Sequence, residues 1–438
     1  MKKANLRITG LAVGAVVTLF SASFSGLTAV TAAEPANPTI SVALAAPPPP
    51  KVMLAEFTKK TGITVKWTQI DWDSLQTKIA AAATAKSYFA DATDVDWSRV
   101  GQLGKLGWFL PLETLIKTDA MAADMPQLSS FKVGTHVVGI PWDASYMVTT
   151  VNKAIFAKAG ITAMPTTIDA YTKDLQQIKA KGIVKYPLNI PFAAAEGLST
   201  YFYQTTNAFG GHILDASGKP LFSSPTSPGY KAAAWMVSAI KTGLVPPGNI
   251  NVADSQGQQT LMAKGLVAST FSDYSGNVGT LYDVPASSSV VHQITYIPTP
   301  GVTATTNNLG NADGIGIPVQ SKYPKAAAKF IEWFTNGQNM ADFAGASGAA
   351  RTWSGYFVPS RLSGMSTLTA KGKLASGAFL GQLLKGSGAV FPQGAPTWYP
   401  EFSRSVYTNL HNAATGSMTV AQAINAMAAT ATKLSAGK

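Results

Sequence analysis

Strand-like and helix-like segments alternate in the first part of the chain, and this alternation limits the fold more than any other feature. Residues 40–45, 63–67 and 93–96 have strand patterns, whereas residues 51–60, 73–86 and 98–107 have helical or turn patterns. Strands that alternate with helices are typical of a parallel sheet whose faces are covered by helices. The sequence therefore predicts an α/β fold.

The length of the chain requires more than one core. A single hydrophobic core rarely grows beyond roughly 250–300 residues, and this chain has 438 residues, of which 46% are apolar. At least two lobes are therefore expected. The polar, glycine-rich segment 299–313 has the composition of a flexible linker between lobes.

The N-terminal residues 1–33 have the pattern of a secretory signal peptide. Lys2, Lys3 and Arg7 precede an apolar stretch, and small residues follow as far as Ala33. No later segment reaches the ~18 uninterrupted apolar residues of a membrane span. We therefore expect an exported, soluble protein, located in the periplasm or outside the cell.

The chain contains no cysteine and four isolated histidines. The lack of cysteine excludes disulfides, a thiol nucleophile and a lipid anchor on an N-terminal cysteine. No histidine has a second histidine at the helical spacing that metal sites use. We expect no metal and no cofactor.

The formal net charge is +12, and residues 1–33 contribute three basic residues and no acid, which leaves 12 − 3 = +9. A basic balance is typical of proteins that bind nucleic acid or membrane phosphate, and also fits a chain with few carboxylates in an extracytoplasmic setting. Because the basic residues never form a run of four, we expect no nucleic-acid partner.

Residues 139–161, GIPWDASYMVTTVNKAIFAKAGI, place a rigid corner between two strand-like runs. The corner is Pro141, Trp142 and Asp143, and Asn152 then has the character of a helix cap. The stretch fits either a surface loop or a crossing between two lobes that carries binding groups.

Seven blocks resemble, in order, the family 1 extracellular solute-binding proteins of ABC importers, the group that includes maltodextrin-binding protein. They are residues 56–67, 91–113, 139–161, 165–182, 209–225, 262–276 and 310–336. The similarity covers most of residues 40–360. Two regions depart from it, the proline-rich residues 46–50 and the loosely similar residues 350–400.

This resemblance implies a two-lobed periplasmic-binding-protein fold of type II. Each lobe would be a mostly parallel sheet flanked by helices, with a ligand cleft between the lobes. Residues 40–145 and 304–346 would form lobe 1, and residues 146–303 and 347–438 lobe 2. The protein would capture a sugar or oligosaccharide by lobe closure and deliver it, as a monomer, to the membrane subunits of an ABC permease.

Aromatic and polar side chains next to predicted strand ends are the candidate ligand-binding residues. A sugar offers flat C–H faces to aromatic rings and a rim of hydroxyls to carboxylates, amides and Arg. The candidates are Trp72, Asp96, Trp97, Arg99, Trp142, Asp143, Glu196, Asp273, Tyr274, Asp313 and Trp353. Glu196 is included because its surroundings resemble the family's acidic and aromatic ligand loop.

Each candidate also has a structural interpretation. The aromatic residues could fill a core, as we expect for Trp67, Trp235 and Trp333. The aspartates could cap helices or form turns, and Arg99 could pair with Asp96 instead of contacting a ligand.

Two other functions remain as alternatives. The first is binding of another small solute, such as a polyol phosphate, a peptide or an anion, which the basic charge would attract. The second is an exported carbohydrate-active hydrolase, which needs a pair of carboxylates. The S-x-x-K motif at Ser129 does not indicate a penicillin-binding enzyme, because K-T-G precedes S-x-N here. We expect no catalytic residues.

Overall fold

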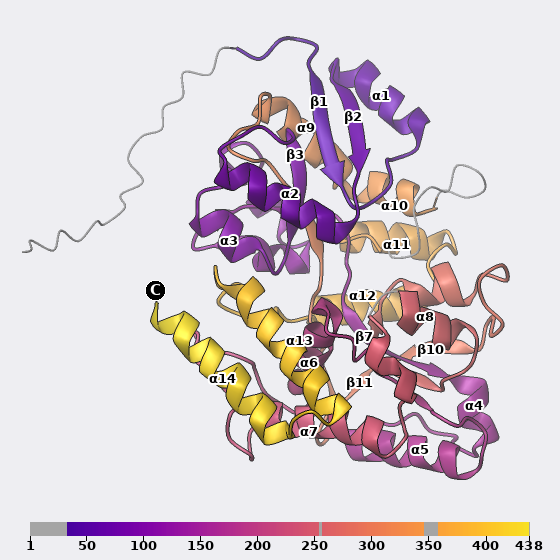
Figure 1. Ribbon diagram of the computed structural model, residues 1–438. Helices are drawn as coiled ribbons and strands as arrows, with labels where there is room; N and C mark the ends of the chain where they lie inside the picture. Colours follow the sequence, from indigo (N-terminus) through magenta and orange to yellow (C-terminus); the bar gives the residue numbers. More distant parts are fainter. Residues whose placement is uncertain (1–32, 254–255, 346–357, 438) are drawn as a thin grey trace, which may run out of the picture. The chain divides into compact units, whose positions relative to one another are not determined.

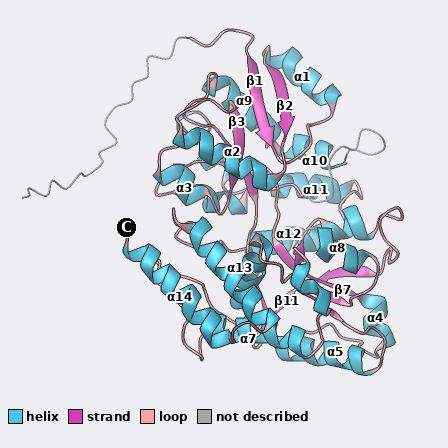
Figure 2. Ribbon diagram, in the orientation of Figure 1, coloured by secondary structure: helices cyan, strands magenta, loops and turns pink. Residues whose placement is uncertain are grey.

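Two separate β-sheets form the framework of the described part of the chain, residues 33–253, 256–345 and 358–437 of a computed structural model (Figure 1). Both sheets belong to the unit formed by residues 35–438. Helices surround each of them (Figure 2). The α/β class expected from the alternating pattern is confirmed.

The first sheet has the strand order β2-β1-β3-β13-β6. Its strands are β1 (Thr39–Leu44), β2 (Thr64–Gln69), β3 (Ala92–Asp96), β6 (Ile140–Pro141) and β13 (Asp313–Gly316). The helices in the same stretches of chain are α1 (Lys51–Thr61), α2 (Trp72–Thr84), α3 (Val100–Lys105), α9 (Pro324–Phe334) and α10 (Gly337–Gly345).

The second sheet has the order β10-β7-β9-β8. Its strands are β7 (Met147–Asn152), β8 (Leu188–Asn189), β9 (Ser269–Tyr274) and β10 (Ile294–Ile297). The remaining helices are α4 (Lys153–Lys158), α5 (Ile168–Ala180), α6 (Glu196–Ala208), α7 (Pro228–Lys241), α8 (Gln256–Ala263), α11 (Leu362–Ala370), α12 (Gly377–Gly386), α13 (Tyr399–Thr415) and α14 (Val420–Ala436).

Short elements complete the fold. Two small ribbons pair β4 (Lys132–Val133) with β5 (His136–Val137) and β11 (Thr299–Pro300) with β12 (Thr305–Thr306). Short helical turns occur at Leu112–Thr114, Thr118–Met121, Pro126–Phe131, Pro247–Asn251 and Val278–Tyr282.

The expected mostly parallel pairing is wrong. In the first sheet β1 runs parallel to β2 and β3, but β13 is antiparallel to both β3 and β6. In the second sheet β7 is antiparallel to β9 and β10, and only β8 pairs in parallel, with β9. A parallel pair needs a crossover such as the helix between β1 and β2, whereas β6 and β13 belong to segments that run in opposite directions between the sheets.

Three segments lie side by side where the described chain passes between the sheets. Residues 142–146 connect β6 to β7, and residues 307–312 lead back to β13. Asn311 N–H donates to the Ser145 carbonyl over 2.7 Å, and Ala144 N–H donates to the Val358 carbonyl over 2.7 Å. Residues 139–161 therefore form a crossing rather than a surface loop.

The return crossing is hydrogen-bonded, which differs from the flexible linker expected over residues 299–313. Asn308 is buried, and its side-chain amide donates to the Met147 carbonyl and to Thr299 Oγ1. Leu309 is buried as well, and its carbonyl accepts from Met147 N–H over 3.1 Å. Polar residues of this segment, such as Asn308, thus form hydrogen bonds to neighbouring segments and are not exposed to solvent.

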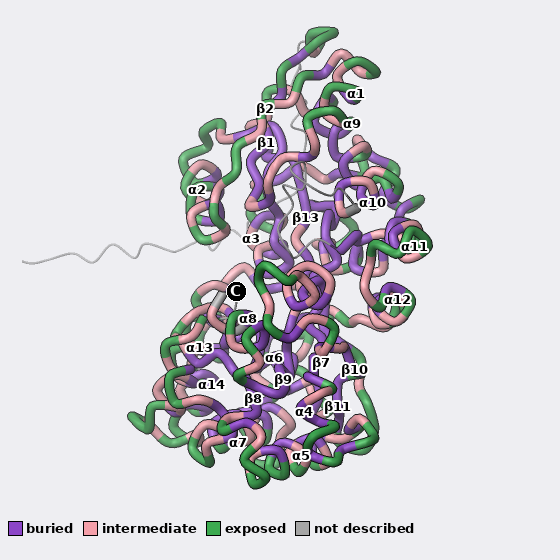
Figure 3. The backbone as a smooth tube through the Cα atoms, turned by 90° about the vertical axis from the view of Figure 1, so that its right-hand side faces the viewer, coloured by how far each residue is buried: buried purple, intermediate pink, exposed green. Residues whose placement is uncertain are grey.

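Local signals and close packing explain particular elements. The Asn152 side chain accepts from the N–H groups of Ala154 and Ile155 and caps α4, as expected. In β13 there is no room for a side chain at Gly314, where a Cβ would lie 2.5 Å from Phe131 Cε1. The strands are mostly buried and the outward helix faces are exposed (Figure 3).

Candidate functional site

A cavity of about 420 Å³ lies between residues of the two sheets. This volume is within the ~300–1,000 Å³ that small-molecule sites have. The cavity is bordered by the ends of β1, β3 and β9, the first turns of α2 and α6, and two of the crossing segments. Its lining residues are Ala45, Ala46, Pro47, Trp72, Asp73, Asp96, Trp97, Ser98, Trp142, Asp143, Ser145, Ala195, Glu196, Gly197, Thr200, Ala253, Tyr274, Asn311 and Asp313.

Most of the residues expected to bind ligand line this cavity. They are Trp72, Asp96, Trp97, Trp142, Asp143, Glu196, Tyr274 and Asp313. Arg99 and Asp273 lie outside the lining, and Trp353 lies outside the described residues. The strand ends of both sheets therefore meet at one site, as ligand sites of open α/β sheets do.

The register of the first sheet brings carboxyl groups together at one end of the cavity. Asp313 is the β13 partner of Asp96 on β3, so their side chains lie next to each other on one face of the sheet. Asp143 reaches the same place from the crossing, where its carboxylate accepts from Asp313 N–H over 2.9 Å and from Ser145 Oγ over 2.6 Å. Asp94 lies two residues before Asp96 and therefore on the same face of β3.

Three of these carboxyl groups, those of Asp94, Asp143 and Asp313, hold their protons more tightly than isolated carboxyls. Burial raises the pKa of Asp143 to about 7, against the attraction of the Ser145 and Asp313 donors. Burial, followed by repulsion from Asp94 and Asp143, raises the pKa of Asp313 well above its ordinary value. Burial and the neighbouring Asp96 do the same to the pKa of Asp94. This end of the cavity therefore holds protons near neutral pH.

Aromatic rings form the other part of the lining. Trp97 and Trp142 are each only 6% exposed, and the Trp97 indole N–H donates to Asn311 Oδ1 over 2.6 Å. Trp142 packs on Phe334 with ring centres 6.3 Å apart. Both tryptophans are thus fixed by packing against the protein and also contribute surface to the cavity.

Arg99 lies behind this aromatic wall. Its guanidinium carbon is 5.6 Å from the centre of the Trp72 ring and 5.9 Å from the centre of the Tyr399 ring. Trp72 begins α2, whose N-cap is the Asp71 carboxylate. Arg99 therefore stacks against a cavity residue without lining the cavity, and no ion pair with Asp96 joins the two described side chains within 4 Å.

Glu196 lines the cavity from the start of α6. It is the first residue of α6, and its carboxylate accepts from the Tyr399 hydroxyl and from Ser403 Oγ on α13. Burial raises the pKa of Glu196, while the Tyr399 bond and the charge of Arg99 partly oppose the rise. Helix α13 therefore fixes this carboxylate.

Asp273 does not line the cavity, and its carboxylate forms hydrogen bonds inside the protein. Its carboxylate accepts from Thr150 Oγ1, the Asn277 amide and the Tyr282 hydroxyl. These bonds join β9 to β7 and to the turn at Val278–Tyr282. Its neighbour Tyr274 lines the cavity, because successive residues of a strand point to opposite faces.

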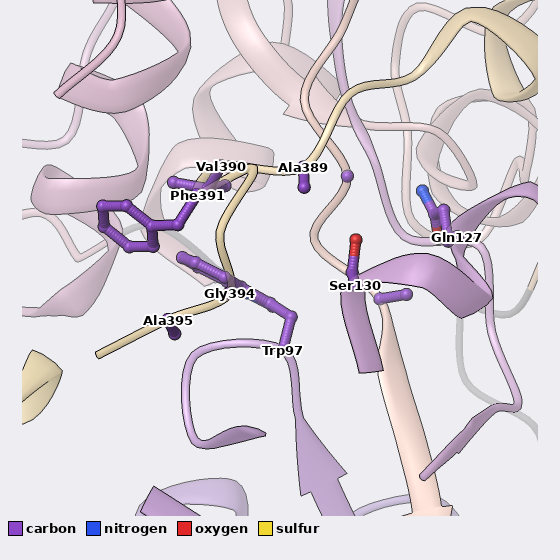
Figure 4. Close-up of a pocket in the computed structure, with 10 residues that line it drawn as sticks. Trp97, Gln127, Ser130, Ala389, Val390, Phe391, Gly394 and Ala395 are labelled. Carbon is purple, nitrogen blue, oxygen red and sulfur yellow. The ribbon is translucent and has the colours of Figure 1, made fainter. Parts of the chain in front are cut away.

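A second cavity, of about 10 Å³, lies beside Trp97. Gln127 and Ser130 lie on one side of it and Phe391 on the other (Figure 4). This volume holds about one water molecule, so of these two cavities the larger one has room for a sugar.

No group of three or more His, Asp or Glu side chains within the described ranges is arranged to hold a metal ion. None of the helices in that same part of the chain is long and apolar enough to cross a membrane.

Residues 44–341 match the model of a protein family described as bacterial extracellular solute-binding proteins. The chain belongs to this family. A protein of Brucella abortus that is described as a putative binding protein is 27% identical to this chain over 212 residues, or 47% of this chain. The match spans 49% of that relative, so this chain covers about half the length of the curated relatives it matches.

Solved structures have the same fold as this solute-binding protein. The maltose-bound MalE3 of T. maritima superposes with a TM-score of 0.75 at 18% identity and covers 91% of this chain and 100% of its own. A solute-binding protein of an ABC transporter from Agrobacterium radiobacter K84, in complex with ribitol, has a TM-score of 0.77 at 22% identity, with 92% and 100% covered. The two-lobed α/β fold is thus shown.

Several residues that line the cleft of the solute-binding protein were not among the sequence candidates. Ala45, Ala46 and Pro47 follow β1, but the rule selects aromatic and polar side chains at strand ends and therefore misses them. Thr200 lies one turn after Glu196 on α6, and Asn311 lies in the return crossing. Sequence offers no comparable signal for these two, because only the fold brings them to the cleft.

Proposed function

We propose that this chain is an exported solute-binding protein that captures a sugar or related polyol in the 420 Å³ cleft and delivers it to an ABC-type permease. The observation that carries the proposal is the lining, in which aromatic rings and hydrogen-bonding carboxyl groups from both sheets surround one cavity. Family membership supports the transport role.

The chemistry of the lining suits polyhydroxylated solutes. The faces of Trp72, Trp142 and Tyr274 offer apolar contact to C–H groups, and Asp96 and Glu196 offer acceptors to hydroxyls. Relatives of the same fold are described in complex with maltose, ribitol and D-mannitol. All three compounds are rich in hydroxyl groups, which favours this class for the present chain.

Closure of the lobes would couple binding to a change of shape. We place lobe 1 at residues 40–145 and 304–346, and lobe 2 at residues 146–303 and 347–438. A ligand stabilises closure only by contacting both lobes, since differential affinity is what shifts the population. Trp142 on one side and Tyr274 on the other give it such contacts.

The proposal includes export through residues 1–33, action as a monomer without a lipid anchor, and no catalysis. An anionic solute is disfavoured, because no Lys or Arg occurs among the described residues that line the cleft. This argues against the polyol phosphate that the overall charge of +12 left open.

A thermal-shift screen followed by calorimetry tests the function. The panel is glucose, galactose, mannose, maltose, sorbitol, mannitol, ribitol, sorbitol 6-phosphate and a dipeptide. We expect a neutral sugar or polyol to bind, and Tyr274→Ala to weaken that binding. Tyr186→Ala is the matched control, because Tyr186 is equally half-buried but lies outside the lining.

Two results contradict the proposal. One is the absence of binding to any sugar or polyol, whether neutral or amino-substituted. The other is hydrolysis of maltose or a longer oligosaccharide by the purified protein at a rate that Asp143→Asn abolishes.

A further inference from the structure

We infer that the solute carries a positive charge: it is a sugar or polyol with a primary ammonium group, which sits among Asp96, Asp143 and Asp313. The inference rests on the proposed function, because it names the chemical class of the solute that the same cleft takes.

The lining is acidic in composition, whereas the chain as a whole is basic. The whole chain has 34 Lys and Arg against 22 Asp and Glu. The described cleft residues include five acids, Asp73, Asp96, Asp143, Glu196 and Asp313, and no Lys, Arg or His. Hydroxyl recognition alone needs acceptors but no such excess of negative charge, because amides and hydroxyls accept equally well.

Within the described ranges, none of the carboxyl groups of Asp94, Asp96, Asp143 and Asp313 forms an ion pair with Lys, Arg or His. Asp143 accepts from a hydroxyl and a backbone N–H. Asp94 is fully buried, and only one of its oxygens has a partner, the Gln76 amide at 2.6 Å; Oδ1 has none within the described structure. Asp94 interacts electrostatically with Asp96 and Asp143. A cluster of buried acids with an unused acceptor beneath it is strongly stabilised by a cation.

The positive charge of Arg99 mainly stabilises the ionised form of Glu196, not of Asp143 or Asp313. Its charge lowers the pKa of Glu196 and, as the smallest of the causes, that of Asp94. The guanidinium stacks between the Trp72 and Tyr399 rings, outside the lining. Asp143 and Asp313 are therefore the acids whose ionised form a ligand cation would stabilise most.

The aromatic rings around these acids favour the same ligand. A cation is attracted to the face of an indole ring in a desolvated site, and Trp97 and Trp142 line the cleft directly after Asp96 and directly before Asp143 in the chain. The same rings pack on the C–H faces of a sugar. A hydroxylated cation uses both properties of the wall, whereas a neutral sugar uses only one.

Binding of a cation should release protons from the cluster. Without ligand, burial raises the pKa of Asp143 to about 7 and the pKa of Asp313 well above its ordinary value. A bound ammonium favours the ionised carboxylates. When a neutral sugar binds, the carboxyl groups would keep their protons or bind additional ones.

Calorimetry on the full mature protein at pH 7 tests the inference with matched pairs that differ only by an amine in place of a hydroxyl. The pairs are glucosamine with glucose, galactosamine with galactose, mannosamine with mannose, and 1-amino-1-deoxysorbitol with sorbitol. At least one amine should bind about tenfold or more tighter than its partner, since a charge-assisted bond in a buried site is stronger than a neutral one. Its binding heat should depend on the ionisation heat of the buffer, as proton release requires.

The variants locate the charge. Asp143→Asn and Asp313→Asn should reduce the amine-to-hydroxyl affinity ratio about tenfold. Glu56→Gln, at an exposed carboxylate of α1 outside the lining, is the control and should leave the ratio unchanged. The wild-type ratio decides the matter even if a variant fails to fold. Equal or tighter binding of every neutral partner overturns the inference but leaves the proposed function intact. Failure of all amines and all neutral sugars and polyols to bind overturns both.

Discussion

Replacing Asp143 by Asn should change how stability depends on pH. This carboxyl group is fully buried where the first sheet borders the cleft, and burial raises its pKa from 3.8 to about 7. An acid with a higher pKa in the folded than in the unfolded chain binds its proton more tightly when folded. Its contribution to stability is complete below pH 3.8 and is lost as the pH rises to about 7.

The size of the loss follows from the two pKa values. Their difference is 7 − 3.8, or about 3, and each pKa unit corresponds to about 1.36 kcal/mol, so ionising Asp143 costs the folded state about 4 kcal/mol. Asparagine is neutral at every pH and resembles the protonated carboxyl in shape. The variant should therefore match the wild type within about 1 kcal/mol near pH 4 and exceed it by up to about 4 kcal/mol at pH 8.

Urea denaturation followed by tryptophan fluorescence at pH 4 and pH 8 measures this difference. Asp73→Asn, at an exposed carboxylate of the same cleft, is the control. The difference between its free energy of unfolding and that of the wild type should be the same at both pH values. If the gap between Asp143→Asn and the wild type is equal at the two pH values, burial does not raise the pKa of this group and the reasoning is refuted.

Three further substitutions test other contacts. Trp72→Ala should weaken sugar binding by about 1–3 kcal/mol in calorimetry by removing an aromatic wall of the cleft; unchanged affinity would place the ligand elsewhere. Tyr399→Phe removes the hydroxyl that donates to Glu196 and should lower the free energy of unfolding by about 1–2 kcal/mol in urea, and a neutral result would mean that solvent replaces this donor. Gly314→Ala puts a Cβ 2.5 Å from Phe131 and should destabilise by about 1–3 kcal/mol; an unchanged thermal midpoint would show that the ring moves freely.

Much of the cleft could be predicted because a local rule applies to it. Aromatic and acidic residues directly after strands were selected, and Asp96, Trp97 and Tyr274 line the cleft for that reason. The rule fails where the face of a strand matters. Asp273 and Tyr274 are neighbours, and only the paired structure shows that the carboxylate points into the protein and the ring into the cleft.

Strand direction and long-range register were beyond the sequence. The alternating pattern indicates parallel strands, but nothing local indicates that β13 inserts antiparallel beside β3 and sets Asp313 against Asp96. Asp94 could have been found, because it is two residues before Asp96 and shares its face. Its importance depends on burial, which the short strand pattern did not reveal.

The position of β13 also determines when the first sheet can be completed during synthesis. The strand lies between β3 and β6, yet it consists of residues Asp313–Gly316, far downstream of both. When β1, β2, β3 and β6 have been synthesised, the strand that joins β3 to β6 is therefore still missing. Contacts between residues so distant in sequence form slowly, so the first sheet is completed late, which would suit the export that we propose for this chain.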